Sequence, residues 1–124
     1  MLTPLDQIIE DKRVNNCISI RMLMVVAHEM AIEKGWWEKE RGIPECLCLI
    51  HSEVSEALEE FRENRDPHYL GEGGKPEGIA VELADVVIRI VDLCGQHGWD
   101  LEEAIVKKLA YNNTRPYRHG GKSA

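Results

Sequence analysis

Two pairs of acidic residues, the members of each pair three residues apart, fall within predicted helices. The first pair is Glu53 and Glu56 in "HSEVSE", and the second is Glu82 and Asp85 in "IAVELADVVIRIV", the most apolar run of the chain. Side chains three or four residues apart share a helix face, so each pair presents two carboxylates in one direction. Carboxylate oxygens are hard ligands that select Mg²⁺, Mn²⁺ or Ca²⁺ over softer metals. The residues alone leave two interpretations open, a magnesium-type site and a solvated polar stripe.

The second pair lies in a helix that is apolar around most of its circumference. Its charged side chains fall within an arc of roughly 80°, and they are Glu82, Asp85, Arg89 and Asp92. A surface helix normally has a wider polar face, so we expect this helix to be enclosed, with its acids in a narrow slot. Carboxylates gathered there repel one another unless protons or cations neutralise them.

The elements that must position these acids are helices. Apolar residues repeat at helical spacing, whereas β-branched residues do not alternate with polar ones. Cap and proline signals predict a short helix after Thr3 and further helices over about 16–34, 44–65, 76–96 and 100–113, with "GEGGKPEG" as a loop. The stripe expected to form core on the second long helix is Leu47, Ile50, Val54, Ala57, Leu58 and Phe61. The predicted fold class is all-α, a four-helix-bundle-like single domain over 1–124 with a short extra N-terminal helix.

Composition limits the classes of partner. A net charge of −7 argues against a duplex nucleic acid, although a metal ion could still bring a free nucleotide to an acidic site. No apolar run is long enough to span a membrane, and no signal peptide is evident, so we expect a cytoplasmic protein. The four cysteines are expected to be buried, reduced thiols: Cys17, Cys46, Cys48 and Cys94.

Other catalytic motifs are incomplete. In "AHEMAI", Ile32 stands where a zinc-protease helix would have its second histidine. None of the five histidines follows a carboxylate by three residues, which argues against di-iron chemistry. "GEGGK" lacks the spacing of a phosphate-binding loop. His51 is interpreted as a packing or surface residue.

With "EVSE" followed about 25 residues later by "ELAD", the chain resembles the MazG-like all-α nucleoside triphosphate pyrophosphohydrolases. Their pattern is ExxE and then ExxD on a later helix. The ending "KLAYNNTRPYRHGGK" is also similar to theirs, with a lysine, an asparagine one turn later and an arginine beyond: Lys108, Asn112 and Arg115. The likeness runs from "AHEMAIEKGWW" to the C-terminus.

The resemblance implies a Mg²⁺-dependent hydrolase, with Mn²⁺ as a substitute, that converts a ribo- or deoxynucleoside triphosphate to the monophosphate and pyrophosphate. It implies four metal ligands: Glu53, Glu56, Glu82 and Asp85. Either Glu53 or Glu56 would be the catalytic base, and the phosphates would be contacted by Lys108, Asn112 and Arg115. It also implies a homodimer or a homotetramer. Within the same superfamily the alternative substrate is phosphoribosyl-ATP, and a non-catalytic helical oligomerisation or regulatory module is the alternative outside enzymes.

Two further features remain open at this stage. Residues 114–124 are expected to be a basic flexible tail, containing Arg115, Arg118, His119 and Lys122, which either solubilises the protein or folds over the triphosphate. Trp36 and Trp37 are adjacent, so a helix could not bury both on one face. We expect one to be core and the other to lie at an interface or against a nucleobase.

Overall fold

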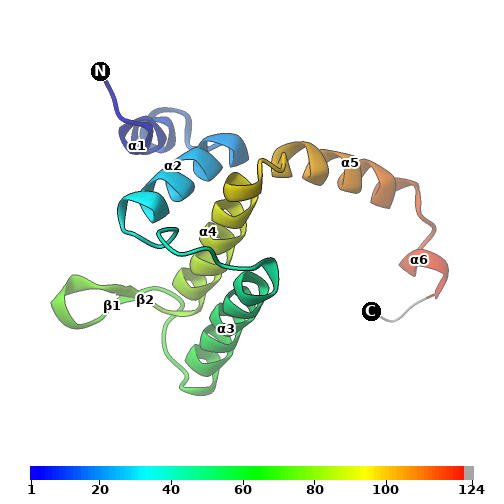
Figure 1. Cartoon of the computed structure of the whole chain (residues 1–124). Coiled ribbons are helices and arrows are strands. Elements are labelled where there is room, and N and C mark those ends of the chain that lie inside the picture. Colours follow the sequence, from blue (N-terminus) through cyan, green and yellow to red (C-terminus); the bar gives the residue numbers. More distant parts are fainter. Residues whose placement is uncertain (122–124) are drawn as a thin grey trace.

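The computed structural model describes residues 1–121, and helices make up most of this chain (Figure 1). The helices are α1 Pro4–Asn15, α2 Ile20–Glu33, α3 Ile43–Arg62, α4 Ile79–His97, α5 Leu101–Thr114 and the short α6 Arg118–Gly121. Between α3 and α4 lie two paired strands, β1 Tyr69–Leu70 and β2 Pro76–Glu77, joined through the 3-10 turn η1 Glu72–Gly74. The all-α prediction is confirmed. No helix within residues 1–121 is long and apolar enough to cross a membrane.

The predicted caps explain where several helices begin. The Thr3 side chain accepts a hydrogen bond from the backbone of Asp6, whose carboxylate accepts one from the backbone of Thr3 in return, so α1 starts in a capping box. Asp100 accepts a hydrogen bond from the backbone of Glu103 and caps α5. The start of α2 was predicted too early, because Asn16 ends α1 in a left-handed conformation and Ser19 caps the next helix.

The start of α4 was also predicted too early. Pro76 belongs to β2, where it pairs with Leu70 in the antiparallel hairpin, and α4 begins only at Ile79. Gly78 makes this turn with a φ of +117°, and a Cβ there would lie 2.2 Å from the Pro67 carbonyl oxygen. Only glycine therefore fits the junction between hairpin and helix.

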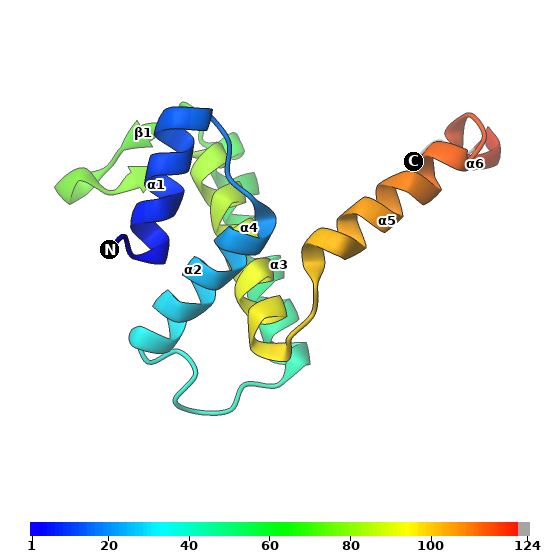
Figure 2. The ribbon, with the colours of Figure 1, turned by 90° about the horizontal axis from the view of Figure 1, so that it is seen from above.

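Helix α4 lies between α2 and α3 and packs against both (Figures 1 and 2). The buried apolar residues come from these three helices: Val26, Ala27, Cys46, Ala57, Val91, Leu93 and Cys94. Of the four cysteines predicted to be buried, Cys46 and Cys94 are, whereas Cys17 and Cys48 are exposed. This correction follows from position, because Cys17 lies between α1 and α2, and Cys48 lies on an exposed face of α3.

Helix α5 extends away from α3 and α4 in both views (Figures 1 and 2). Its first turn is tied to α2, because the Arg21 side chain donates to Asp100 at 3.0 Å and its backbone N–H donates to Glu102 at the same distance. Beyond this first turn its residues are largely exposed. The four long helices thus do not close a bundle within one chain.

The prediction that the apolar stripe of α3 forms core is mostly wrong. Leu47, Val54, Leu58 and Phe61 are between 47% and 65% exposed, while Ala57 is buried and Ile50 is half-buried. Helix α4 is likewise not enclosed, because three of its large apolar side chains are exposed: Leu83, Val87 and Ile88. The reason is the position of α5, which leaves these faces uncovered and exposes four large apolar side chains of its own: Ile105, Val106, Leu109 and Tyr111.

Candidate metal centre and adjoining cavity

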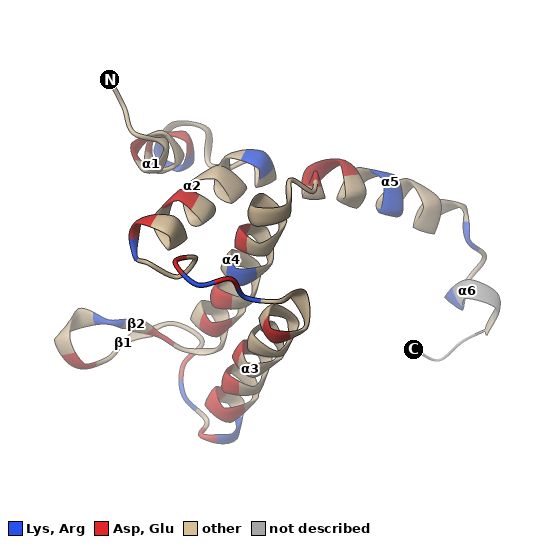
Figure 3. Cartoon of the chain, in the orientation of Figure 1, with Lys and Arg blue, Asp and Glu red and all other residues tan. Residues whose placement is uncertain are grey.

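Three of the four predicted acidic ligands come together. Glu53 of α3 and Glu82 and Asp85 of α4 each offer one carboxylate oxygen, and these three oxygens all lie within 4.8 Å of one another. Packing of α3 against α4 brings the two sequence motifs together, and both helices carry several acidic positions along their length (Figure 3). We call Glu53, Glu82 and Asp85 the acidic triad.

Glu56, the fourth predicted ligand, is not part of the triad. It lies one turn further along α3, is exposed, and does not come within the 4.8 Å grouping. It remains close enough for its charge to help raise the pKa of Glu82.

The triad is electrostatically strained. Burial raises the pKa of the Glu82 carboxyl, and the neighbouring Asp85, Glu53 and Glu56 charges raise it further. Burial and the Glu53 charge also raise the pKa of Asp85, while the Arg89 and Lys75 charges lower it. A divalent cation would relieve this repulsion. Three hard oxygen donors fit Mg²⁺, which retains several waters or takes phosphate oxygens in its remaining positions.

Another acid on α3 has a structural role. Glu60 is buried and accepts hydrogen bonds from the Tyr69 hydroxyl, at 3.0 and 2.9 Å, and from Arg65 at 3.1 Å. These bonds fasten the β-hairpin to the end of α3. With its oxygens committed in this way, Glu60 is not a candidate ligand.

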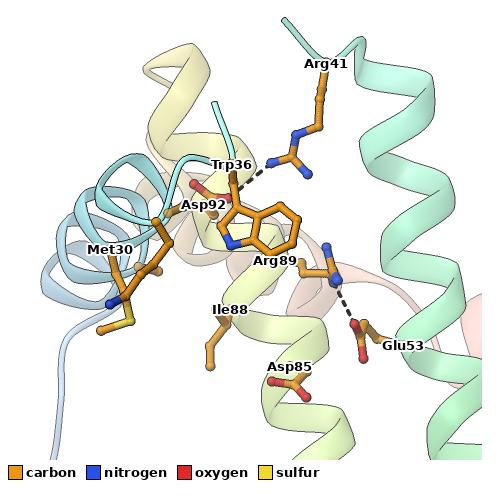
Figure 4. A pocket seen from close by; sticks show the side chains of 11 residues that line it. Met30, Trp36, Arg41, Glu53, Asp85, Ile88, Arg89 and Asp92 are labelled. Carbon is orange, nitrogen blue, oxygen red and sulfur yellow. Dashed lines mark hydrogen bonds and ion pairs between the residues drawn. The ribbon is translucent and has the colours of Figure 1, made fainter. Parts of the chain in front are cut away.

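A cavity of about 350 Å³ adjoins the triad (Figure 4). Glu53, Asp85 and Arg89 line one part of it, and the other lining residues are Ala27, Met30, Ala31, Lys34, Trp36, Arg41, Ile88 and Asp92. The lining therefore combines apolar groups, an aromatic ring and charges of both signs. Such a cavity suits a ligand with a flat, largely apolar part and an anionic part.

The adjacent Trp36 and Trp37 have different environments, although neither is fully buried as the expected core tryptophan would be. Trp37 is half-buried and donates from Nε1 to Asp92 Oδ1 at 2.9 Å, whereas Trp36 is 63% exposed and borders the cavity. His28 Nδ1 also bonds Asp92 Oδ1 at 2.9 Å, and the Arg41 guanidinium lies 4.3 Å from the Trp37 ring centre and 3.9 Å from Asp92. Asp92 thereby anchors the loop after α2 on α4 through Trp37 and Arg41.

The predicted phosphate-binding residues do not reach the triad. Lys108, Asn112 and Arg115 lie on or directly after α5, the helix that extends away from α3 and α4 (Figure 1). The Lys108 ammonium and the Arg115 guanidinium lie 5.0 and 5.9 Å from the Tyr111 ring centre. Within the described chain neither forms an ion pair with an acid of the triad. Of the predicted tail, residues 118–121 form α6, and Lys122 lies outside the described residues.

Sequence reasoning did not assign a role to Arg89 or Asp92. Both lie on the same face of α4 as Glu82 and Asp85, and this shared face was the sequence feature that could have indicated a role at the site. Arg41 lies in a loop, where no periodicity could have indicated its contact with Trp37.

Comparison with protein families, with characterised proteins and with solved structures finds no match to this chain.

Proposed function

We propose that this protein is a Mg²⁺-dependent nucleoside triphosphate pyrophosphohydrolase. The observation that carries the proposal is the convergence of Glu53, Glu82 and Asp85, from two different helices, at one side of a cavity that contains an exposed tryptophan. The resemblance of "EVSE" and "ELAD" to the MazG-like pattern supports the same activity. The substrate class is a ribo- or deoxynucleoside triphosphate.

The cavity has parts suited to each portion of such a substrate. A nucleobase is flat and has faces that stack on aromatic and apolar groups, which matches the Trp36 ring together with Met30 and Ile88. The triphosphate is anionic, which requires cations, and the triad is where a divalent ion would bind. Mn²⁺ has similar ligand preferences and is expected to replace Mg²⁺.

The reaction needs a nucleophile, a base and stabilisation of the leaving pyrophosphate. Magnesium, when bound, lowers the pKa of a coordinated water and offsets charge on the phosphate oxygens. Glu53 or Glu56 accepts the proton of the attacking water. Lys108, Asn112 and Arg115 meet the charge that develops on the leaving group.

We also propose that a second copy of the chain completes the site, because of the position of α5. The α5 helix cannot deliver Lys108 to the triad of its own chain in the arrangement observed. The exposed apolar stripe of α3 and the exposed apolar residues of α5 need a cover, because contiguous apolar surface of this kind marks an interaction site. We therefore propose a homodimer or homotetramer in which α5 of one chain closes a four-helix bundle on another.

Pyrophosphate release tests the activity. The protein is incubated with Mg²⁺ and a panel of ribo- and deoxynucleoside triphosphates, with phosphoribosyl-ATP included as the alternative substrate, and a metal-free control is run in parallel. Release with at least one nucleotide is expected, and Glu56→Gln and Asp85→Asn should each abolish it with helicity unchanged. No release with any substrate would end the proposal.

Mixed oligomers test the shared site. Asp85→Asn and Lys108→Ala are each expected to be inactive alone. If the triad of one chain works with α5 of another, co-refolded mixtures contain sites with both parts intact, and part of the activity returns. No recovery in a mixture that has exchanged subunits would place both parts in one chain.

The exposed apolar faces also favour a second candidate function, a non-catalytic helical oligomerisation module. Thermal stability in millimolar Mg²⁺ separates the two, because a ligand that binds the native state stabilises it. A stability gain specific to divalent ions favours the enzyme, and its absence favours the module.

A further inference from the structure

Arg89 lies between the triad and the tryptophan of the cavity. Its Nε donates to Glu53 Oε1 at 2.7 Å, and its guanidinium borders the cavity on the side where Asp85 and Trp36 also lie (Figure 4). The side chain is 38% exposed, whereas that of Glu53 is 15% exposed. Arg89 is thus fixed on its inner edge and open on its outer edge.

The remaining donors of Arg89 are unused. Within residues 1–121 no hydrogen bond joins either of its terminal amino groups to a protein acceptor, although together they carry four N–H donors. A guanidinium held at Nε presents a planar fork that matches two oxygens of a phosphate. Arg41, the other arginine of the cavity, also has an unused donor, because its buried Nε has no hydrogen-bond partner in the described part of the chain. Its side chain, however, is 16% exposed against 38% for Arg89, and its guanidinium stacks on the Trp37 ring beside Asp92.

The order of groups along the cavity defines which phosphate would meet this fork. If the nucleobase lies against Trp36 and a metal at the triad holds the phosphate chain, the sugar and the phosphate attached to it lie between them. Arg89 occupies this intermediate position.

The geometry points to Arg89 as the residue that binds the α-phosphate of the substrate, with its Nε held by Glu53. This inference rests on the proposed function and adds a phosphate contact within the chain that carries the triad. It separates the roles of the cations: Arg89 binds oxygens of the α-phosphate, which water attacks, and Lys108 and Arg115 meet the charge of the leaving pyrophosphate.

Ligand binding to Arg89→Met and Arg89→Lys tests this role. The probes are MgCl₂ alone, the α,β-methylene analogues of dATP, dCTP, dGTP and dTTP in the presence of Mg²⁺, and pyrophosphate as the fragment without an α-phosphate. Arg13→Met is the matched control, because Arg13 is also an arginine paired with a glutamate but lies on α1 with 70% of its side chain exposed.

The three kinds of ligand are expected to respond differently. For Arg89→Met the Kd of the analogue that binds wild type best should rise at least about tenfold, since a charge-assisted hydrogen bond to phosphate is lost. The Kd of pyrophosphate should stay within about threefold, and Mg²⁺ should bind as well or more tightly, because a nearby positive charge has gone. Arg89→Lys, which keeps the charge but not the fork, should fall between wild type and Arg89→Met.

Three results would overturn the inference: an unchanged Kd for the analogue, an equal loss for pyrophosphate, or a parallel loss of Mg²⁺ binding, which would make Arg89 only a brace for Glu53. Failure of the proposed function is distinguishable, because wild type would then bind neither Mg²⁺ nor any nucleotide analogue. Circular dichroism of both variants checks that they fold. If Arg89→Met does not fold, Arg89→Lys alone is used for the test.

Discussion

Replacing Asp85 by asparagine should make the protein more stable and remove its response to magnesium. The carboxyl group of Asp85 has a raised pKa because it is partly buried and close to the Glu53 charge. Asparagine keeps the shape of the side chain without the charge. The substitution thus relieves repulsion in the folded protein and removes one oxygen ligand of the proposed ion.

The size of the effect follows from the spacing of the triad. Two unit charges at the 4.8 Å limit of the grouping repel by about 0.9 kcal/mol in water and about 3.5 kcal/mol at an effective dielectric constant of 20. The triad is open to solvent on one side and Arg89 offsets part of the repulsion, so we expect a gain near the lower limit, about 1 kcal/mol. For a chain of this size that corresponds to a rise in Tm of about 3 to 6 °C.

Magnesium should act on wild type alone. At a concentration 100 times its Kd, a single bound ion adds about 2.7 kcal/mol to the free energy of unfolding. Without magnesium, Asp85→Asn should therefore melt above wild type, and with magnesium the order should reverse.

Thermal melts at a fixed protein concentration, with and without MgCl₂, measure both effects. Asp11→Asn on α1 is the control for loss of a negative charge, since its oxygen can still accept the hydrogen bond from Gln7. An Asp85→Asn protein that is less stable than wild type in the absence of metal, or that gains as much from magnesium, would refute this electrostatic account.

Three further predictions concern pH, assembly and the fold. The pKa values of Glu82 and Asp85 are raised in the folded state, so the folded protein binds more protons than the unfolded protein, and the contribution of these groups to stability falls as pH rises through their titration range. Protons compete with magnesium for the same carboxylates, so the magnesium-induced gain in Tm should be smaller at pH 4.5 than at pH 7.5. An unchanged gain would contradict the assignment of these carboxylates as metal ligands. Phe61→Glu, on the exposed stripe of α3, should shift the oligomer toward monomer in analytical ultracentrifugation, whereas unchanged association would remove this stripe from the interface. Gly78→Ala should lower the free energy of unfolding in urea melts by more than about 1 kcal/mol, because its Cβ would meet the Pro67 carbonyl, and wild-type stability would contradict the described junction.

Much of the local structure could be predicted from the sequence because it depends on local physics. Thr3 and Asp100 cap helices through their own side chains, and such signals lie within four residues of the bond they make. Helix periodicity predicted that the members of each acidic pair share a helix face, whereas the convergence of Glu53 with Glu82 and Asp85 depends on the packing of α3 against α4. The start of α4 was missed because Pro76 is compatible both with a first helical turn and with an edge strand.

What could not be predicted depends on contacts between distant segments. Phe61 and Leu58 have the periodicity of core residues, but whether a helix covers them depends on where α5 goes, and no pattern within α3 encodes that. The bond between Arg89 and Glu53 joins residues 36 positions apart. Its donor was recognised as a polar residue of the slot, and its partner became clear only once α3 and α4 were packed.

The most direct test of the central claim is the identity of the products. ³¹P NMR of a reaction with the preferred triphosphate and Mg²⁺ should reveal monophosphate and pyrophosphate forming in equal amounts, with neither forming in EDTA or with Asp85→Asn. Formation of diphosphate and orthophosphate would contradict cleavage between the α- and β-phosphates, and the absence of turnover with every triphosphate would contradict the assignment as an enzyme of this class.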